Sequence, residues 1–129
     1  MKTIVDVLSE KRNFMSLSGA SPQDITDAEQ TLKVQFADDY IAYVTKFGAA
    51  SYYGHELTGV CKAKSLDVVG ITISEKEFND VLADWYVIEQ AHIDGIVFWQ
   101  ASDGKIYQTT PHENAKKICD SLIEYINLD

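Results

Sequence analysis

An Asp103-Gly104 pair separates two short alternating runs near the end of the chain, and it constrains the fold more than any other feature. The flanking runs, IVFWQAS and KIYQTT, are rich in aromatic and β-branched residues, which favour strands. Asp-Gly between two such runs predicts a hairpin with a tight turn, because glycine readily adopts the positive φ angles that the turn requires. The C-terminal half of the chain is therefore expected to contain antiparallel sheet.

Other strands follow from the same residue preferences. Residues 85–90 alternate between apolar and polar side chains, and residues 96–101 form the first arm of the hairpin. Residues 52–61 and 67–73 also contain aromatic and β-branched residues and are predicted as strands. Glycines within these two segments are expected to mark bends or bulges.

Three helices are predicted in the N-terminal half. Residues 3–12 carry an apolar face at helical spacing, and residues 22–33 follow Ser21, a residue suited to cap a helix. Residues 38–47 carry an apolar stripe that ends at Gly48, a natural left-handed C-cap. Two aspartates in the first turn of that helix are favourably placed at the positive end of its dipole.

Two capping boxes predict further helices. Ser74 and Glu77 would open a helix over residues 74–85, and Thr110 with Glu113 would open a C-terminal helix. The apolar stripe of that last helix would consist of Ile118, Leu122 and Ile126. Helices, then a mostly antiparallel sheet, then a closing helix predict an α+β fold, with the N-terminal helices and the C-terminal helix packed on the sheet.

Length and composition indicate an ordinary globular protein. The 129 residues fit a single domain over 1–129, and 46% of them are hydrophobic. There is no apolar run of the roughly 20 residues that a membrane span needs, and Asp6 interrupts the apolar residues near the start. We therefore expect a cytoplasmic protein, with Cys61 and Cys119 as reduced thiols rather than a disulfide.

Charge is concentrated in one segment. The chain has a net charge of −9, and residues 65–104 hold eight acidic residues against Lys76 alone, a net −7. Nucleic acid and anionic membranes are disfavoured as partners of such a chain. The segment is either a solvated face that keeps the protein soluble or a surface for a basic protein partner. Repulsion between acidic faces favours a monomer or a weak dimer.

The sequence contains no recognisable catalytic, metal or cofactor motif. Adjacent Asp38 and Asp39 point in different directions from a helix, so paired-carboxylate chemistry is disfavoured. No histidine or cysteine pair has the spacing of metal ligands, and no phosphate-binding glycine loop occurs. An enzyme would need His55, Glu56 and Cys61 to converge in one cleft.

The segment AEQTLKVQFADDYIAYVTKFGAASYYGHELTG resembles the signature of the SUKH superfamily. The matching positions are Ala28, Glu29, Leu32, Asp39, Tyr40, Tyr43, Val44, Phe47, Gly48, Gly54, Leu57 and Gly59. Phe36-Ala37 replaces the usual Leu-Pro, and Gly48-Ala49 replaces the usual Gly-Gly. Downstream, residues 85–126 resemble the family's strands, Asp-Gly hairpin and final helix.

The resemblance implies an α+β fold without catalysis. Many bacterial members are immunity proteins that bind and neutralise a toxin, often a nuclease, and fungal relatives include a regulator of cell-wall synthesis. Together with the charge, this predicts an acidic surface that binds a basic toxin domain. The alternative is a regulatory or scaffold protein that binds a host factor. The predicted contact residues are Glu75, Glu77, Asp80, Asp84, Glu89 and Asp94, with Tyr52 and Tyr53 as aromatic anchors.

Overall fold

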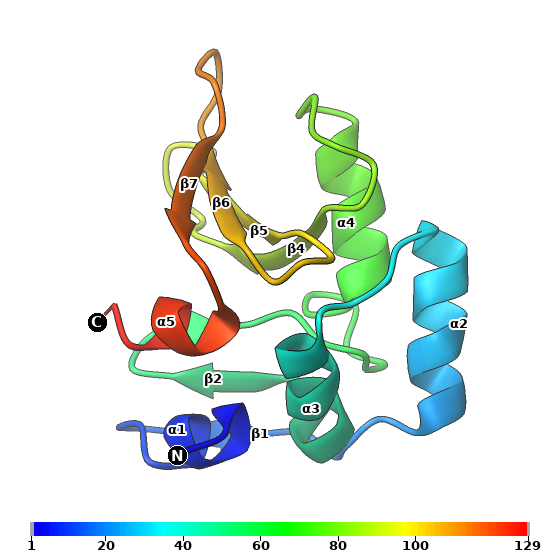
Figure 1. Ribbon diagram of the computed structural model, residues 1–129, viewed down its shortest axis with the longest axis vertical. Helices are drawn as coiled ribbons and strands as arrows, with labels where there is room; N and C mark the ends of the chain where they lie inside the picture. The colour runs from blue at the N-terminus through cyan, green and yellow to red at the C-terminus, as the bar shows by residue number, and fades with distance from the viewer. Residues whose placement is uncertain (1, 129) are drawn as a thin grey trace.

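The computed structural model describes residues 2–128, which form five helices and two antiparallel sheets (Figure 1). The sheets have the strand orders β1-β2-β3 and β4-β5-β6-β7. The predicted α+β class is confirmed. In chain order the elements are α1 (Ile4–Ser9), β1 (Met15–Ser16), α2 (Pro22–Leu32), α3 (Asp38–Phe47), β2 (Ala50–Tyr52), β3 (His55–Glu56), α4 (Val68–Lys76), β4 (Tyr86–Gln90), β5 (Val97–Gln100), β6 (Ile106–Thr109), β7 (Lys116–Cys119) and α5 (Leu122–Ile126).

The three N-terminal helices form where the sequence predicts them. Ser21 caps α2, its hydroxyl accepting the Asp24 N–H at 3.1 Å. Gly48 ends α3 with a φ of 69°. A capping box between Thr3 and Asp6 starts α1, which is shorter than predicted. These helices are well predicted because each of their caps depends on a few adjacent residues.

Helix α4 overturns two predictions. The segment 67–73 is expected as a strand, but its residues 68–73 form most of this helix, and Ser74, expected as an N-cap, lies near the end of the helix. The actual N-cap is Asp67, whose carboxylate accepts the Val69 N–H at 3.2 Å. The buried residues of α4 are Val68, Ile71 and Thr72, at helical spacing. Packing of this face outweighs the strand preference of a β-branched run, and the chain from residue 77 to residue 85 is consequently a loop rather than a helix.

The strand predicted over residues 52–61 forms only in part. After the short β3, Leu57 makes an isolated antiparallel bridge with Glu89, and the Thr58 N–H donates to the Ile88 carbonyl at 2.8 Å. This segment thereby connects the smaller sheet to β4.

The predicted hairpin joins β5 to β6, although its turn is longer than an Asp-Gly pair. The Gly104 N–H donates to the Ala101 carbonyl at 2.9 Å, so Ser102 and Asp103 are the central residues of the turn. Gly104 follows them with a φ of 97°, which explains why glycine is needed at that position.

The predicted C-terminal helix is also corrected. Residues 110–113 form a turn, in which His112 has a φ of 65°, and no helix starts there. The following residues pair with β6 as β7, so that Cys119 lies opposite Ile106. Helix α5 begins only after Ser121, whose hydroxyl accepts the Glu124 N–H at 3.1 Å. Pairing with a neighbouring strand therefore outweighs the local capping signal.

The four-stranded sheet separates two groups of buried side chains. The buried side chains of one face cluster with Ile71 of α4, and those of the other cluster with residues of all five helices, Val68 of α4 included. Figure 1 shows this sheet curving beside α4, with α5, β2 and α1 below it. The α4 side has Val87, Val97 and Trp99 of the sheet, with Trp85 and Ala101 beside its strands, and the opposite side includes Tyr86, Ile88, Ile106 and Cys119.

Buried tyrosine hydroxyls connect the helices to the strands. The Tyr43 hydroxyl accepts the Ala50 N–H at 2.9 Å and donates to the Thr58 carbonyl at 2.7 Å. The Tyr86 hydroxyl accepts the Ala37 N–H at 2.9 Å. Burial raises the pKa of both phenols well above the ordinary value, because the charged form would lose its hydration. These groups are therefore held neutral in the folded protein.

Gly48 and Gly59 allow two backbone segments to approach closely. The Val60 N–H donates to the Gly48 carbonyl at 3.0 Å. A Cβ atom on Gly59 would lie 1.8 Å from the Gly48 carbonyl oxygen. Any side chain at Gly59 would therefore force these segments apart.

Candidate functional site

Four of the predicted contact acids lie together at the end of α4 and in the loop that follows it. Glu75 is in the last turn of α4, and Glu77, Asp80 and Asp84 belong to residues 77–84, which we call the α4–β4 loop. This loop runs from the upper end of α4 down to β4 (Figure 1). Half of the eight acidic residues of segment 65–104 thus lie at the end of α4 and in the loop that follows it.

The α4–β4 loop is fixed near both ends by hydrogen bonds. The Lys76 ammonium donates to the Ala83 carbonyl at 2.9 Å, and the Asn79 side chain donates to the Glu75 carbonyl at 2.9 Å. The Asp84 carboxylate accepts the Ser102 N–H at 3.2 Å. The loop therefore has a defined conformation before any partner binds.

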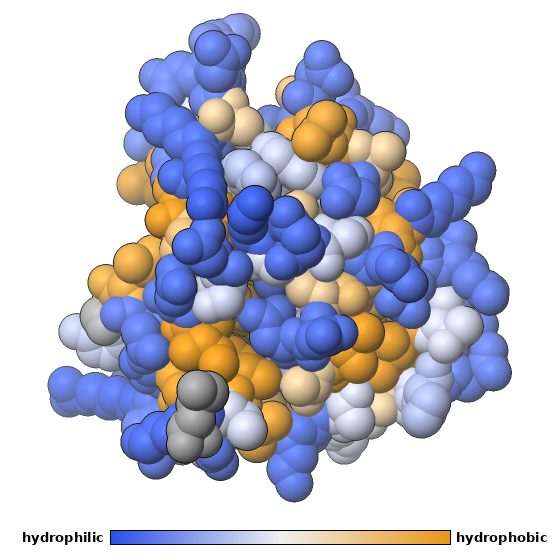
Figure 2. All heavy atoms as spheres, viewed as in Figure 1, coloured by the Kyte–Doolittle hydropathy of each residue, from blue (hydrophilic) through white to orange (hydrophobic). Residues whose placement is uncertain are grey.

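Two large hydrophobic residues of this loop face solvent. Phe78 is 80% exposed and Leu82 is 65% exposed. Phe78 would belong to the helix predicted over residues 74–85, but α4 ends at Lys76, before that residue. The turn-forming pair Asn79-Asp80 was the sequence signal for this break. Figure 2 shows a hydrophobic group exposed among hydrophilic side chains near the upper end of α4.

The predicted contact acids differ in how far they are buried and hydrogen-bonded within the protein. Glu77 and Asp80 are exposed, whereas Glu75 is half-buried and accepts the Gln90 side-chain N–H at 2.7 Å. Asp94 lies elsewhere, in the β4–β5 loop, where the neighbouring Gly95 approaches Pro111. Asp94 therefore does not belong to the group at the end of α4.

Glu89, predicted as a surface contact, is buried with 5% exposure. The cause is a bulge in β4, where the pairing with β5 shifts between Val87 and Glu89. Simple alternation would place Glu89 on the α4 side with Val87. The bulge instead pairs it with Phe98 and turns it to the opposite face, a change of direction that bulges commonly produce.

Inside that face, Glu89 forms a polar cluster with two aromatic residues. One carboxylate oxygen lies 2.9 Å from His55 Nδ1, and the other accepts a short hydrogen bond from the Tyr125 hydroxyl. An ionised carboxylate only accepts hydrogen bonds, so a hydrogen bond between His55 Nδ1 and the ionised Glu89 requires a proton on Nδ1. The Nδ1 contact orients the imidazole ring of His55.

This cluster lines a cavity of about 290 Å³. Its walls come from the β2–β3 turn, the ends of β4 and β5, and α5. We call it the Glu89 cavity. An oriented histidine beside a carboxylate could move a proton, but no serine, cysteine or lysine is among the described residues that line the cavity to act as nucleophile. The described lining residues are Tyr52, Gly54, His55, Glu89, Ala91, Phe98, Tyr125 and Leu128.

The two predicted aromatic anchors have different environments. Tyr52 is 1% exposed, and its ring stacks on His55 with a centroid distance of 5.0 Å, so it is not available as a surface anchor. Tyr53 is 56% exposed at the tip of the β2–β3 turn, with a φ of 45°. This turn belongs to the smaller sheet, so the predicted contact set does not form one surface around the α4–β4 loop.

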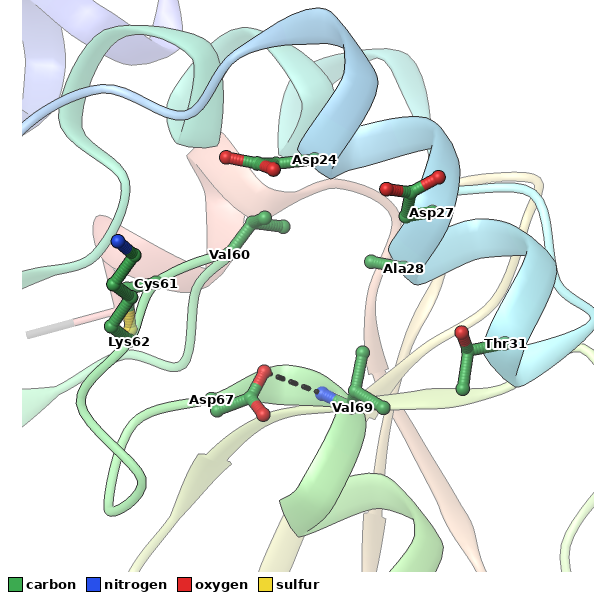
Figure 3. Close-up of a pocket in the computed structure, with 9 residues that line it drawn as sticks. All are labelled: Asp24, Asp27, Ala28, Thr31, Val60, Cys61, Lys62, Asp67 and Val69. Carbon is green, nitrogen blue, oxygen red and sulfur yellow. Dashed lines mark hydrogen bonds between the residues drawn. The ribbon is translucent and has the colours of Figure 1, made fainter.

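Cys61 lines a second cavity, of about 320 Å³, between α2 and the start of α4 (Figure 3). Asp24 and Asp27 of α2 lie on one side of it, and Asp67 lies on the other. Burial, and to a lesser degree the Asp67 charge, raises the pKa of the Cys61 thiol. A raised pKa lowers the fraction of reactive thiolate. Within residues 2–128, no group of three or more metal-ligating side chains is found.

The residues required for the enzyme hypothesis line separate cavities. His55 lines the Glu89 cavity, Cys61 lines the cavity beside α2, and Glu56 lines a third one near β1. The described structure therefore does not bring these three side chains together in one cavity.

Fold and sites define the class of this molecule: an α+β protein with an exposed loop that is both acidic and apolar, and a buried carboxylate cavity. The chain belongs to the SMI1-KNR4 cell-wall family SUKH_5, whose model matches residues 1–128. The resemblance to the SUKH superfamily is thereby confirmed. No curated protein sequence matches the chain. None of the described helices is long and apolar enough to cross a bilayer.

Proposed function

We propose that the chain is a cytoplasmic immunity protein, folded as one domain, that binds a cognate toxin domain and neutralises it without catalysis, metal or cofactor. The observation that carries this proposal is the exposure of Phe78 and Leu82 beside Glu77 and Asp80. Large exposed hydrophobic residues with a polar rim are typical of protein interfaces.

The partner that best fits this loop is a basic protein domain. With a net charge of −9, the chain attracts basic surfaces, and opposite charge accelerates association. Phe78 and Leu82 supply apolar area that a partner pocket can bury. Hydrogen bonds at both ends of the loop reduce the entropy lost on binding. Nuclease toxins, which bind nucleic acid, tend to have such basic surfaces.

The proposed contact set follows the geometry of the loop. Its centre consists of Glu77, Phe78, Asp80 and Leu82, and Glu75 and Asp84 lie at its edge. Glu89 and Tyr52 are left out because they are buried. Tyr53 and Asp94 would be contacted only by a partner that also reaches the β2–β3 turn and the β4–β5 loop.

The first experiment is co-expression with the toxin domain encoded beside this gene. Purification of a stable complex and rescue of growth in the producing cells are the expected results. If the two proteins neither associate nor restore growth, the immunity proposal is wrong for that pair.

Charge reversal tests the location of the interface. The double variant Glu77→Lys with Asp80→Lys should weaken toxin binding at least about tenfold. The double variant Asp27→Lys with Glu113→Lys is the matched control, because it makes the same change in net charge at exposed residues elsewhere. Phe78→Ala should weaken binding about thirtyfold, as expected for an interface anchor, with the circular dichroism spectrum unchanged. Equal effects of both double variants would contradict a local acidic interface.

A second candidate function is regulation through a host factor, which the cell-wall description of the family supports. The same loop would then bind a protein of the host rather than a toxin. Growth rescue separates the two candidates, since only the immunity function protects cells from a toxin. Affinity capture with wild-type protein and with Phe78→Ala would then identify partners that depend on the loop.

A further inference from the structure

The Glu89 cavity has no part in the proposed function, because it lies on the opposite face of the four-stranded sheet from α4. It nevertheless contains an unusual feature, a buried glutamate whose side chain is only 6% exposed. Removing a carboxylate from water is costly unless a positive charge compensates it. No lysine or arginine is among the described residues that line the cavity. Among residues 2–128, the ion-pair partner of Glu89 is His55, which bears a positive charge only when protonated.

The carboxylate of Glu89 is held in a fixed orientation. His55 and Tyr125 each contact one of its oxygens, and each oxygen has a second lone pair that can accept another hydrogen bond. The β-bulge fixes the direction of the whole side chain. A ligand with N–H groups would therefore meet an acceptor that is already oriented.

The walls of the cavity suit a positive charge on an apolar stem. Tyr52, Phe98 and Tyr125 contribute aromatic rings, with the Phe98 and Tyr125 centroids 5.3 Å apart at an interplanar angle of 57°. Aromatic faces attract cations, and a nearby carboxylate adds to the attraction. Ala91 and Leu128 add apolar surface. A volume of about 290 Å³ fits one small group rather than a large ligand.

We propose that the Glu89 cavity binds a single alkylguanidinium or alkylammonium group. The cationic head donates hydrogen bonds to Glu89, and the alkyl stem lies against the aromatic rings. This inference concerns a different site from the α4–β4 loop and does not depend on the immunity function.

The test is titration of the full chain with n-butylguanidinium, observed by NMR, with n-butylurea as the neutral analogue of the same shape. The cation should shift the ring signals of His55, Phe98 and Tyr125 in a saturable way. n-Butylurea should bind at least about tenfold more weakly, because it lacks the charge that strengthens a hydrogen bond to carboxylate.

Glu89→Gln should weaken butylguanidinium binding at least about tenfold. Glu56→Gln should leave it unchanged, because it removes the same charge from an exposed residue outside the cavity lining. If the Glu89 carboxylate contributes to ligand binding and not to the stability of the fold, the melting temperature of Glu89→Gln should not fall. Should that variant fail to fold, the comparison of the two ligands on the wild-type protein still decides.

Equal binding of butylurea and butylguanidinium would overturn the proposal, as would an absence of saturable shifts with the cation. Retained binding in Glu89→Gln would do the same. Two pentapeptides, one with a central arginine and one with citrulline in its place, test whether the cationic group comes from a protein side chain or from a small organic cation. Binding of the arginine peptide alone identifies a protein side chain as the ligand. If only butylguanidinium binds, the ligand is a small organic cation.

Discussion

At the scale of single residues, the lack of a side chain at Gly59 allows two backbone segments to lie in close contact. Its backbone lies against the Gly48 carbonyl, and a neighbouring N–H bonds to that same oxygen. Both glycines belong to the segment that resembles the SUKH signature. The close backbone contact explains why position 59 of this chain has no room for a side chain.

Gly59→Ala should lower the free energy of unfolding by about 3 kcal/mol or more, because the new methyl group would overlap the Gly48 carbonyl and displace backbone. Urea titration followed by circular dichroism measures the change. A loss below about 1 kcal/mol would show that the two segments separate easily, contrary to the packing described here.

Glu89 marks the limit of sequence reasoning at this scale. The sequence predicts it as a surface contact, whereas the structure buries it on the face of the sheet opposite α4. The bulge that redirects it depends on the pairing between β4 and β5, which involves residues distant in the chain. The exposure of Phe78 is also not evident from its neighbours in the sequence, since it depends on where α4 ends.

At the scale of elements, the sequence predicts correctly the helix caps and the hairpin that depend on a few adjacent residues. Ser21 and Gly48 cap their helices as expected, and the region around Asp103-Gly104 forms a hairpin. Errors occurred where distant contacts decide between two local preferences. The segment after Asp67 becomes a helix by packing on β4, and the segment before Cys119 becomes a strand by pairing with β6.

Two opposite substitutions in α4 test its assignment as a helix. Asp67→Ala should cost about 1 kcal/mol, because the Val69 N–H loses its capping acceptor. Gly70→Ala should stabilise by about 0.5–1 kcal/mol, because Gly70 is exposed in the helix and a Cβ there would approach only Asp67, at 3.7 Å. Thermal and urea unfolding measure both changes. If residues 67–73 were instead a strand, Gly70→Ala would not be expected to stabilise through helix propensity.

At the scale of the whole molecule, the buried phenols make stability depend on alkaline pH. Burial raises the pKa of Tyr40, Tyr43 and Tyr86 above the ordinary value of 10.0, to which they return on unfolding. Above pH 10 the unfolded chain therefore binds fewer protons than the folded chain. Stability from these groups is complete below that pH and is lost as the pH rises.

The free energy of unfolding should accordingly fall as the pH rises past 10, with a slope that approaches about 1.4 kcal/mol per pH unit for each of the three tyrosines. Urea titrations between pH 9 and pH 11 measure the slope. Tyr40→Phe should reduce that slope by about one third. A stability independent of pH over this range would contradict the neutral, buried state of the phenols.

The carboxylate of Asp39 joins distant parts of the chain, since it accepts the Leu122 N–H at 2.7 Å and the Gln100 side-chain N–H at 2.9 Å. Helix α5 also packs on α1, and the Lys11 ammonium donates to the Asn127 side chain at 2.9 Å. The N-terminal helices thus need residues that the ribosome adds about eighty positions after Asp39. Their apolar faces therefore stay uncovered through most of translation, and the nascent chain is expected to depend on protection from chaperones during that interval.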